Sequence, residues 1–220
     1  MLTQVAREQM IEQQVRAWDV LDERILAALR AVPRERFVPE AWRELSFADC
    51  EIALPCGKRM LRPMLVGRLL QSLALRGGEQ VLEVGTGTGY VSACLARLGA
   101  QVRSLELHPQ LAEQARANLA NLNGLAGSRP VEVIETDGMQ LDDRSRYDAI
   151  VLTASLPIYQ PRFERALRPG GRLFVVVGAG TPQRARLIRC ASEGDCSSES
   201  LFETCIEALE GAPRPATFDF

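Results

Sequence analysis

Hydrophobic and polar residues alternate with a helical period in the first part of the chain. Apolar side chains recur at helical spacing over Val5–Val15 and again over Ile25–Val32. Asp22 precedes the second segment and is a suitable N-cap, and Pro33, which cannot continue a helix, follows it. The pattern predicts two amphipathic helices near the N-terminus.

A third helix is expected after a segment that has no clear period. Residues 46–62 match neither helical nor strand periodicity, which predicts a loop. Pro63 suits the first turn of a helix that continues through Leu73, and the glycines at 77 and 78 end it. We therefore expect a helical N-terminal cap with an attached loop over residues 1–78.

Beyond the cap, the pattern changes to short apolar segments rich in Val, Ile and Leu. Five of these are predicted strands: residues 80–84, 101–106, 131–135, 147–153 and 172–177. Helical stretches at Val91–Leu98 and Gln110–Leu122 separate the first three strands, which indicates right-handed βαβ units. We expect residues 79–220 to form an α/β core around a mostly parallel sheet that makes one compact unit with the cap. Residues 184–190 and 200–209 are weaker strand candidates at the edge of that sheet.

Composition indicates a globular protein and excludes several classes of function. Hydrophobic residues make up 46% of the chain, and 26 basic residues against 28 acidic ones give a net charge of −2. No global basic field is therefore available to attract nucleic acid. No apolar run approaches the roughly 20 residues needed to cross a bilayer, and the N-terminal segment lacks the apolar core of a signal peptide. We expect a cytoplasmic protein without nucleic-acid or membrane partners.

Cysteine and histidine usage argues against a metal centre. The chain has six cysteines, none of them in a C-x-x-C pair, and His108 is its one histidine. We expect reduced thiols and no metal site. The stretch from Cys190 to Gly211 contains acidic residues but no Lys or Arg, and we interpret it as a solvated edge.

The sharpest local signal is the sequence QVLEVGTGTGY at residues 80–90. A predicted strand leads directly into Gly85, Gly87 and Gly89, and a predicted helix follows. Glycines at such a junction allow a tight turn and let a ligand approach the backbone. In open α/β sheets, ligands bind beyond the carboxyl ends of the strands, which is where this loop lies.

The spacing of the loop distinguishes between cofactors. The P-loop pattern G-x-x-x-x-G-K-[ST] is absent, and the third glycine of a G-x-G-x-x-G dinucleotide loop would fall at Tyr90. Glu83 stands two residues before the first glycine, where its charge disfavours a pyrophosphate. S-adenosylmethionine has no phosphate, and its ammonium and sulfonium groups suit an acidic neighbour. The loop therefore favours S-adenosylmethionine over NAD or ATP.

Residues at the ends of neighbouring strands support this assignment. Glu106 ends the second strand, at the usual place for a carboxylate that binds both ribose hydroxyls. Asp137 and Gly138 follow the third strand, where a side chain can reach an adenine edge. Thr153 and Ala154 end the fourth strand and would face the cofactor from the other side.

Together these features resemble a class I methyltransferase, and the N-terminus narrows the resemblance. The segment MIEQQVRAWDVLDERILAALRAVPRERFVPE, which begins at Met10, is similar to the opening of protein-L-isoaspartate O-methyltransferases. LEVGTGTGY, YDAIVLTAS and LRPGGRL also resemble that family's forms. The resemblance implies a Rossmann-like, doubly wound and mostly parallel sheet with an antiparallel last strand. It also implies methyl transfer from S-adenosylmethionine to the α-carboxyl of isoaspartyl residues in damaged proteins or peptides, with S-adenosylhomocysteine as the product.

A cofactor site follows from the resemblance and from the loop spacing. The expected cofactor-binding residues are Glu83, Gly85, Thr86, Gly87, Gly89, Tyr90, Glu106, Leu107, Asp137, Gly138 and Thr153.

The loop before the third helix departs from the family pattern. The family reads close to I-G-x-G-Q-T-I-S-x-P there, and this chain reads LPCGKRMLRP. Lys58, Arg59 and Leu61 stand where the family has Gln, Thr and Ser. The serine is the family's candidate catalytic residue, and leucine can neither donate nor accept a hydrogen bond.

The departure leaves alternatives for the acceptor open. Lys58, the only lysine of the chain, and Arg62 are the candidate catalytic residues, acting as an anion clamp that positions the acceptor. An isoaspartyl protein or peptide is the first expected partner, and another carboxylate or small anionic metabolite is the second. A protein that binds the cofactor without methylating is the third interpretation.

Overall fold

The helical cap forms as its periodicity predicts. The structure, a computed structural model, describes residues 2–121 and 129–216. The cap consists of α1 (Leu2–Met10), which continues through a π-helical turn at Ile11–Val15 and a 3-10 turn at Arg16–Trp18, followed by α2 (Glu23–Ala31) and α3 (Pro63–Leu73). The Asp22 carboxylate accepts a hydrogen bond from the Arg24 backbone N–H and caps α2, as expected.

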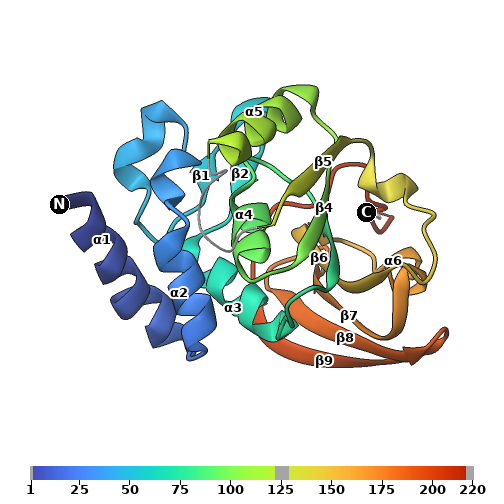
Figure 1. The fold of residues 1–220 in the computed structure, drawn as a ribbon. Helices are drawn as coiled ribbons and strands as arrows, with labels where there is room; N and C mark the ends of the chain where they lie inside the picture. The colour runs from blue at the N-terminus through green and yellow to red at the C-terminus, as the bar shows by residue number, and fades with distance from the viewer. Residues whose placement is uncertain (1, 122–128, 217–220) are drawn as a thin grey trace.

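The central sheet has the predicted doubly wound topology (Figure 1). Its strands are β3 (Gln80–Val84), β4 (Gln101–Glu106), β5 (Val131–Glu135), β6 (Tyr147–Leu156), β7 (Leu167–Val177), β8 (Gln183–Ser192) and β9 (Asp195–Thr204). They lie in the order β5-β4-β3-β6-β7-β8-β9. The strands from β5 to β7 are parallel, and β8 and β9 are antiparallel to their neighbours. Strand order reverses between β3 and β6, and this switch point sets the place of a ligand site.

The remaining elements connect the sheet and the cap. They are α4 (Tyr90–Arg97), α5 (Pro109–Ala120), α6 (Arg162–Arg165), four 3-10 turns at Arg34–Arg36, Glu40–Leu45, Pro55–Gly57 and Gly138–Gln140, and the short strands β1 (Ile52–Ala53) and β2 (Arg59–Met60). The predicted end of the helix at Leu122 lies outside the described residues. The expectation that 46–62 is only a loop was wrong in part, because β1 and β2 pair there as an antiparallel ribbon too short to show a period.

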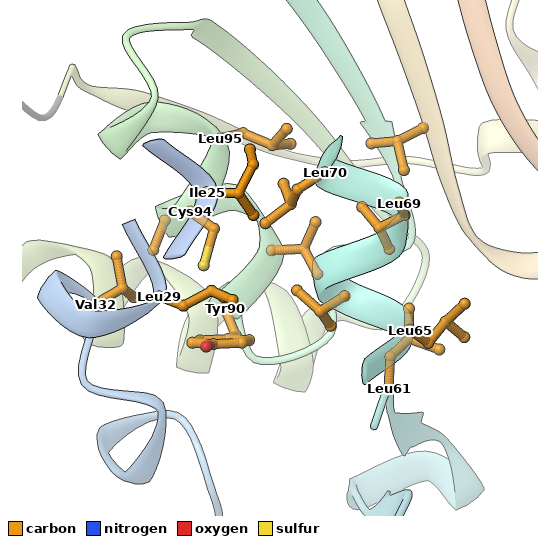
Figure 2. Close-up of a cluster of buried hydrophobic side chains, with 14 of the residues drawn as sticks. Ile25, Leu29, Val32, Leu61, Leu65, Leu69, Leu70, Tyr90, Cys94 and Leu95 are labelled. Atoms are coloured by element: carbon orange, nitrogen blue, oxygen red, sulfur yellow. The ribbon is translucent and has the colours of Figure 1, made fainter. Parts of the chain in front are cut away.

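A single apolar cluster joins the cap to the α/β core. Ile25 and Leu29 of α2, Leu65 and Leu70 of α3 and Leu95 of α4 all belong to this buried cluster. Figure 2 shows Ile25, Leu70 and Leu95 close together where the three helices meet. Burying one such side chain stabilises the fold by about 1.5–3 kcal/mol, so the cap is held firmly against the sheet.

Arg34 fixes the course of the loop between α2 and α3. Its side chain is fully buried, and burial lowers the pKa of its guanidinium. The Nε group donates to the Ser46 carbonyl at 2.9 Å, and Nη2 donates to the Leu61 carbonyl at 2.8 Å. The guanidinium also lies over the Tyr90 ring, 5.0 Å from its centroid. One buried side chain therefore attaches both ends of the 46–61 segment to α4.

The C-terminal hairpin differs from expectation in two ways. Strand β9 begins at Asp195 and ends at Thr204, earlier than the predicted 200–209 segment, because the chain turns inward at Ile206. The expectation of reduced thiols was wrong for Cys190 and Cys196, which form a disulfide between β8 and β9. The hairpin register places these two residues directly opposite each other. Within the described ranges, no helix is both long enough and apolar enough to span a bilayer.

Candidate cofactor and acceptor site

A cleft of about 720 Å³ opens at the carboxyl ends of β3, β4 and β6, at the switch point of the sheet. The Gly-rich loop and the strand ends form its floor. The segment 54–61, hereafter the acceptor loop, and the C-terminal segment 207–210 form its rim. Two segments that are far apart in the sequence thus meet over one ligand-sized space.

The glycine loop has the conformation that its sequence requires. Gly85, Gly87 and Gly89 all have positive φ values, of 94°, 55° and 88°. A Cβ atom at Gly85 would lie only 2.5 Å from the Thr153 hydroxyl, which donates to the Val84 carbonyl at 3.1 Å. The close approach of β6 to this turn therefore excludes any side chain at Gly85.

Glu106 occupies the end of β4 and faces the loop. One carboxylate oxygen accepts from the Gly87 backbone N–H at 2.8 Å, and the other accepts from the His108 backbone N–H at 3.0 Å. The side chain lines the cleft although Glu106 is only 5% exposed. Its position fits a carboxylate that binds a ribose, as its place in the sequence predicts.

Asp137 and Gly138 line the cleft beyond β5. The Asp137 carboxylate caps the 3-10 turn that follows by accepting from the Met139 backbone N–H at 2.8 Å. A Cβ atom at Gly138 would come within 2.4 Å of a Val84 methyl group. Glycine is therefore required for this turn to pack against β3.

A smaller cavity of about 330 Å³ adjoins the cleft on the side of the cap, and Glu83 and Thr88 are among the residues that line it. Glu83 Oε1 and the Thr88 hydroxyl are buried and have no hydrogen-bond partner among the described residues. The other Glu83 oxygen accepts from Ser104 at 2.7 Å and from Ser92. Unsatisfied buried groups are costly, so this cavity fits a ligand that supplies polar partners.

Burial dominates the electrostatics of Glu83. It raises the pKa of this carboxyl to about 7, against the hydrogen bonds from Ser92 and Ser104, which lower it. A ligand that brings positive charge next to Glu83 would favour the ionised form. The donor set therefore fits the ammonium and sulfonium of S-adenosylmethionine better than a phosphate.

The other expected cofactor residues lie around these two cavities. Leu107 lines the cleft, and Thr86 lines the smaller cavity with its hydroxyl 2.6 Å from that of Ser104. Tyr90 lines the smaller cavity from below and is buried. Gly89 lines neither cavity and instead begins α4, where Ala115 and Leu119 of α5 pack against it.

The two candidate acceptor cations have separate environments. Lys58 Nζ lines the cleft and lies 3.1 Å from a Glu207 oxygen and 2.9 Å from a Glu210 oxygen. Arg62 lines neither cavity, because its Nη2 donates to the Thr204 hydroxyl at 3.0 Å and its guanidinium lies over the Trp18 ring. Leu61 is 7% exposed and lines both cavities. The loop thus presents one cation paired with glutamates, one directed at β9, and an apolar side chain at Leu61.

Sequence reasoning missed the C-terminal segment 207–210 as part of the site. The acidic stretch was interpreted as a solvated edge, but Glu207 and Glu210 contact Lys58 at the cleft. Ser155 at the end of β6 holds this segment, because its backbone N–H donates to the Glu207 carbonyl and its carbonyl accepts from the Leu209 N–H, both at 2.8 Å. The absence of Lys and Arg between Cys190 and Gly211 was the available signal, since acidic residues without local partners can pair with a distant cation.

Comparisons with known proteins identify the family of this chain. The profile of the family described as protein-L-isoaspartate(D-aspartate) O-methyltransferase matches residues 5–207. The chain belongs to this family. A protein-L-isoaspartate O-methyltransferase from Methanoculleus marisnigri is 42% identical over 174 residues, which cover 78% of this chain and 77% of the relative. Protein-L-isoaspartate O-methyltransferase 1 from Rhodopseudomonas palustris is 36% identical and covers 96% of this chain and 90% of the relative.

A solved structure confirms the fold of the family. It is a Plasmodium falciparum beta-aspartate methyltransferase in complex with S-adenosyl-L-homocysteine, with a TM-score of 0.78 and 18% identity. The match covers 93% of this chain and 98% of that one. The protein-L-isoaspartate O-methyltransferase family match therefore includes the cap, the acceptor loop and the sheet, and it reaches the first residue of the C-terminal segment. Among the residues that the structure describes, no group of His, Cys, Asp and Glu side chains is arranged to hold a metal ion.

Proposed function

We propose that this chain methylates the α-carboxyl group of isoaspartyl residues in proteins or peptides, with S-adenosylmethionine as the methyl donor. The observation that carries this proposal is the cleft at the β3–β6 switch point, in which the Gly85–Gly89 loop and Glu106 meet beneath the acceptor loop. Family membership and the printed activity of the relatives support the same reaction. The protein is an S-adenosylmethionine-dependent O-methyltransferase.

Different residues of the two cavities would bind different parts of the cofactor. Glu106 would bind the ribose hydroxyls, and Asp137 would bind the adenine edge. Glu83, with its free oxygen in the smaller cavity, would attract the positively charged end. When bound, S-adenosylmethionine supplies a methyl group on a positively charged sulfur, which keeps the electron pair of the broken carbon–sulfur bond.

A carboxylate acceptor is already ionised at neutral pH, so the protein needs only to align it with the methyl group and to exclude water from the site. No general base is required, and His108, the one histidine, faces Glu210 at the rim of the cleft. The methyl ester that forms can cyclise to a succinimide, which can reopen to normal aspartate. Methylation of this carboxyl group thereby allows repair of the damaged residue.

Lys58 and Arg62 would act on the acceptor side. Lys58 lies at the rim, where it joins the acceptor loop to the C-terminal segment. Arg62 fixes the end of the acceptor loop to β9 through Thr204. We assign both residues to positioning the acceptor loop. A small free carboxylate as the acceptor has no support from the relatives described above, which are named for a protein substrate.

Transfer of radiolabelled methyl groups tests the proposal. The protein is incubated with methyl-labelled S-adenosylmethionine and either an isoaspartyl peptide or the same peptide with a normal aspartate. We expect base-labile label in the isoaspartyl peptide alone. Equal labelling of the two peptides would contradict selectivity for the isoaspartyl linkage. Binding of S-adenosylhomocysteine without labelling of either peptide would identify a cofactor-binding protein without this activity.

A further inference from the structure

The acceptor loop and its continuation carry three cations, and two of them are already paired with protein groups. Lys58 Nζ contacts two carboxylates, at 3.1 Å from Glu207 and 2.9 Å from Glu210. Arg62 is directed away from the cleft toward Thr204 and Trp18. The charge of Lys58 is therefore already compensated by two carboxylates, and the guanidinium of Arg62 does not face the cleft.

Arg59 is in a different position. It lines both the cleft and the smaller cavity, and its side chain is 56% exposed. Among the described residues its one ion-pair contact is with Glu51, where Nε and Oε2 are 4.0 Å apart, too far for a hydrogen bond. Its backbone is nevertheless fixed, because β2 pairs Arg59 with Ala53 of β1. A fixed backbone and an exposed guanidinium without a close carboxylate partner make Arg59 the cation of this loop that is available to a ligand.

We propose that Arg59 is a specificity-determining residue that binds the α-carboxylate of the acceptor. The inference rests on the proposed function, since it assumes that the acceptor enters this cleft. A guanidinium keeps its charge at all physiological pH values and has several N–H donors in one plane. A hydrogen bond from Arg59 to one carboxylate oxygen orients the group and leaves the second oxygen free to accept the methyl. Lys58, which is paired with Glu207 and Glu210, instead joins the acceptor loop to the C-terminal segment.

A pair of peptides that differ only at the acceptor group tests this assignment. One isoaspartyl peptide carries the free α-carboxylate, and the other carries an α-carboxamide. Their affinities are measured by calorimetry in the presence of S-adenosylhomocysteine, for the wild-type protein and for Arg59→Gln, Arg59→Lys and Arg76→Gln. Arg76 is the matched control, because it is an exposed arginine that lines neither cavity.

We expect the wild-type protein to bind the carboxylate peptide about 10- to 100-fold more tightly than the carboxamide, as one charged hydrogen bond implies. Arg59→Gln removes this preference, Arg59→Lys retains part of it, and Arg76→Gln leaves it unchanged. The affinity for S-adenosylhomocysteine alone is measured in all four proteins, and Arg76→Gln leaves it unchanged. In the methylation assay, KM for the isoaspartyl peptide rises in Arg59→Gln, and kcat changes less.

The outcomes separate the inference from the proposed function. If Arg59→Gln keeps the carboxylate preference, or if the wild-type protein has none, Arg59 does not bind the acceptor. If the wild-type protein transfers no methyl group but Arg59→Gln still abolishes the binding preference, the inference holds and the proposed reaction fails. Thermal unfolding shows whether each variant is folded. If Arg59→Gln is unfolded, the carboxylate preference of Arg59→Lys, which retains the charge, is compared with that of the wild-type protein.

Discussion

Lys58 Nζ lies 2.9 Å from a carboxylate oxygen of Glu210, and this contact joins the acceptor loop to the C-terminal segment across the mouth of the cleft. Partial burial lowers the pKa of Lys58, but the hydrogen bonds to Glu210 and Glu207 outweigh it and raise the pKa overall. His108 Nε2, at the start of α5, lies 3.1 Å from the same Glu210 oxygen. Glu210 therefore connects the acceptor side of the cleft with the cofactor side.

The first prediction concerns opening of the cleft. Glu210→Gln removes one charge partner of Lys58, so release of S-adenosylhomocysteine should become faster. Because exposed ion pairs contribute little, we expect an increase of at most a few-fold. Stopped-flow fluorescence measures the release rate. Glu193→Gln is the control, because Glu193 pairs with Arg144 at the surface and lines neither cavity. An unchanged rate in Glu210→Gln would show that this contact does not restrict the cleft.

The second prediction concerns the ribose carboxylate. Glu106→Ala should weaken binding of S-adenosylhomocysteine by about 1–3 kcal/mol, because the ligand loses a charged hydrogen-bond partner. Part of this loss comes from weaker positioning of the glycine loop, since Glu106 also accepts hydrogen bonds from the Gly87 and His108 backbone N–H groups. Calorimetry gives the affinity, and Glu113→Ala, an exposed change on α5, is the control. Equal affinities for wild type and Glu106→Ala would remove Glu106 from the binding site.

The third prediction concerns the buried carboxyl of Glu83, whose pKa burial raises to about 7. A raised carboxyl pKa means that the folded protein binds this proton more tightly than the unfolded chain. The Glu83 contribution to the free energy of unfolding is therefore fully present below about pH 4.5 and is lost as the pH rises through about 7. Denaturant unfolding should show this loss in the wild-type protein but not in Glu83→Gln, which stays neutral.

Cofactor binding should show the opposite dependence on pH. A positively charged ligand favours ionised Glu83, so affinity for S-adenosylmethionine rises between pH 6 and 8 and protons are released on binding. Calorimetry in two buffers of different ionisation enthalpy counts those protons. Proton release that persists unchanged in Glu83→Gln would assign it to another group.

The fold was predictable because short contiguous stretches of the sequence specify its strands and turns. The apolar strands QVLEV and VEVIE and the glycines between β3 and α4 are contiguous in the sequence, and each specifies its own geometry. Gly85 directly follows β3 and Glu106 ends β4, and the parallel pairing of these two strands brings both residues to one edge of the sheet. The sequence pattern therefore predicts which strand ends border the cleft, although Gly89, one of the expected cofactor residues, lines neither cavity.

The acceptor half depends on contacts between distant segments, which no local pattern records. Glu207 meets Lys58 because Ser155 holds the C-terminal segment beside β6. The direction of Arg62 depends on the position of Thr204 in β9. The 190–196 disulfide likewise depends on the register of a hairpin, and a register cannot be read from weakly patterned strands.

The fourth prediction concerns that disulfide. Cys190 and Cys196 are six positions apart, so their bond closes a short loop and restricts the unfolded chain only slightly. The loop-entropy relation gives about 2 kcal/mol for this length. The double variant Cys190→Ser with Cys196→Ser should lower the unfolding midpoint by a few degrees and leave S-adenosylhomocysteine binding unchanged. Cys94→Ser is unsuitable as a control because Cys94 is buried in the core, whereas exposed Cys205→Ser is suitable. A change in cofactor affinity in the double variant would contradict the prediction.

The fifth prediction concerns Leu61, which stands where the family resemblance expects a serine. Because leucine offers no hydrogen bond, we expect weak isoaspartyl turnover beside normal cofactor binding. One aligned hydroxyl in a transition state contributes about 2–4 kcal/mol by analogy with oxyanion-hole donors, or roughly 30- to 1,000-fold in rate. Lys58→Gln combined with Leu61→Ser should therefore raise methylation of an isoaspartyl peptide at least about tenfold.

The buried position of Leu61 means that Leu61→Ser should also destabilise the fold, and a second leucine of the cleft wall provides a control. Leu61 is 7% exposed and packs in the main apolar cluster, so Leu61→Ser should lower the free energy of unfolding by about 2–4 kcal/mol. The loop should keep its course, because Arg34 binds the carbonyl of residue 61 rather than its side chain. Leu54→Ser, combined with the same Lys58→Gln change, is the control elsewhere on the cleft wall, where Leu54 is 8% exposed. Faster methylation by the pair with Leu61→Ser but not by the pair with Leu54→Ser would assign the gain to the hydroxyl at position 61. Equal gains in both would instead attribute it to a loosened cleft, because the two changes remove similar apolar bulk and only one restores a donor beside the acceptor.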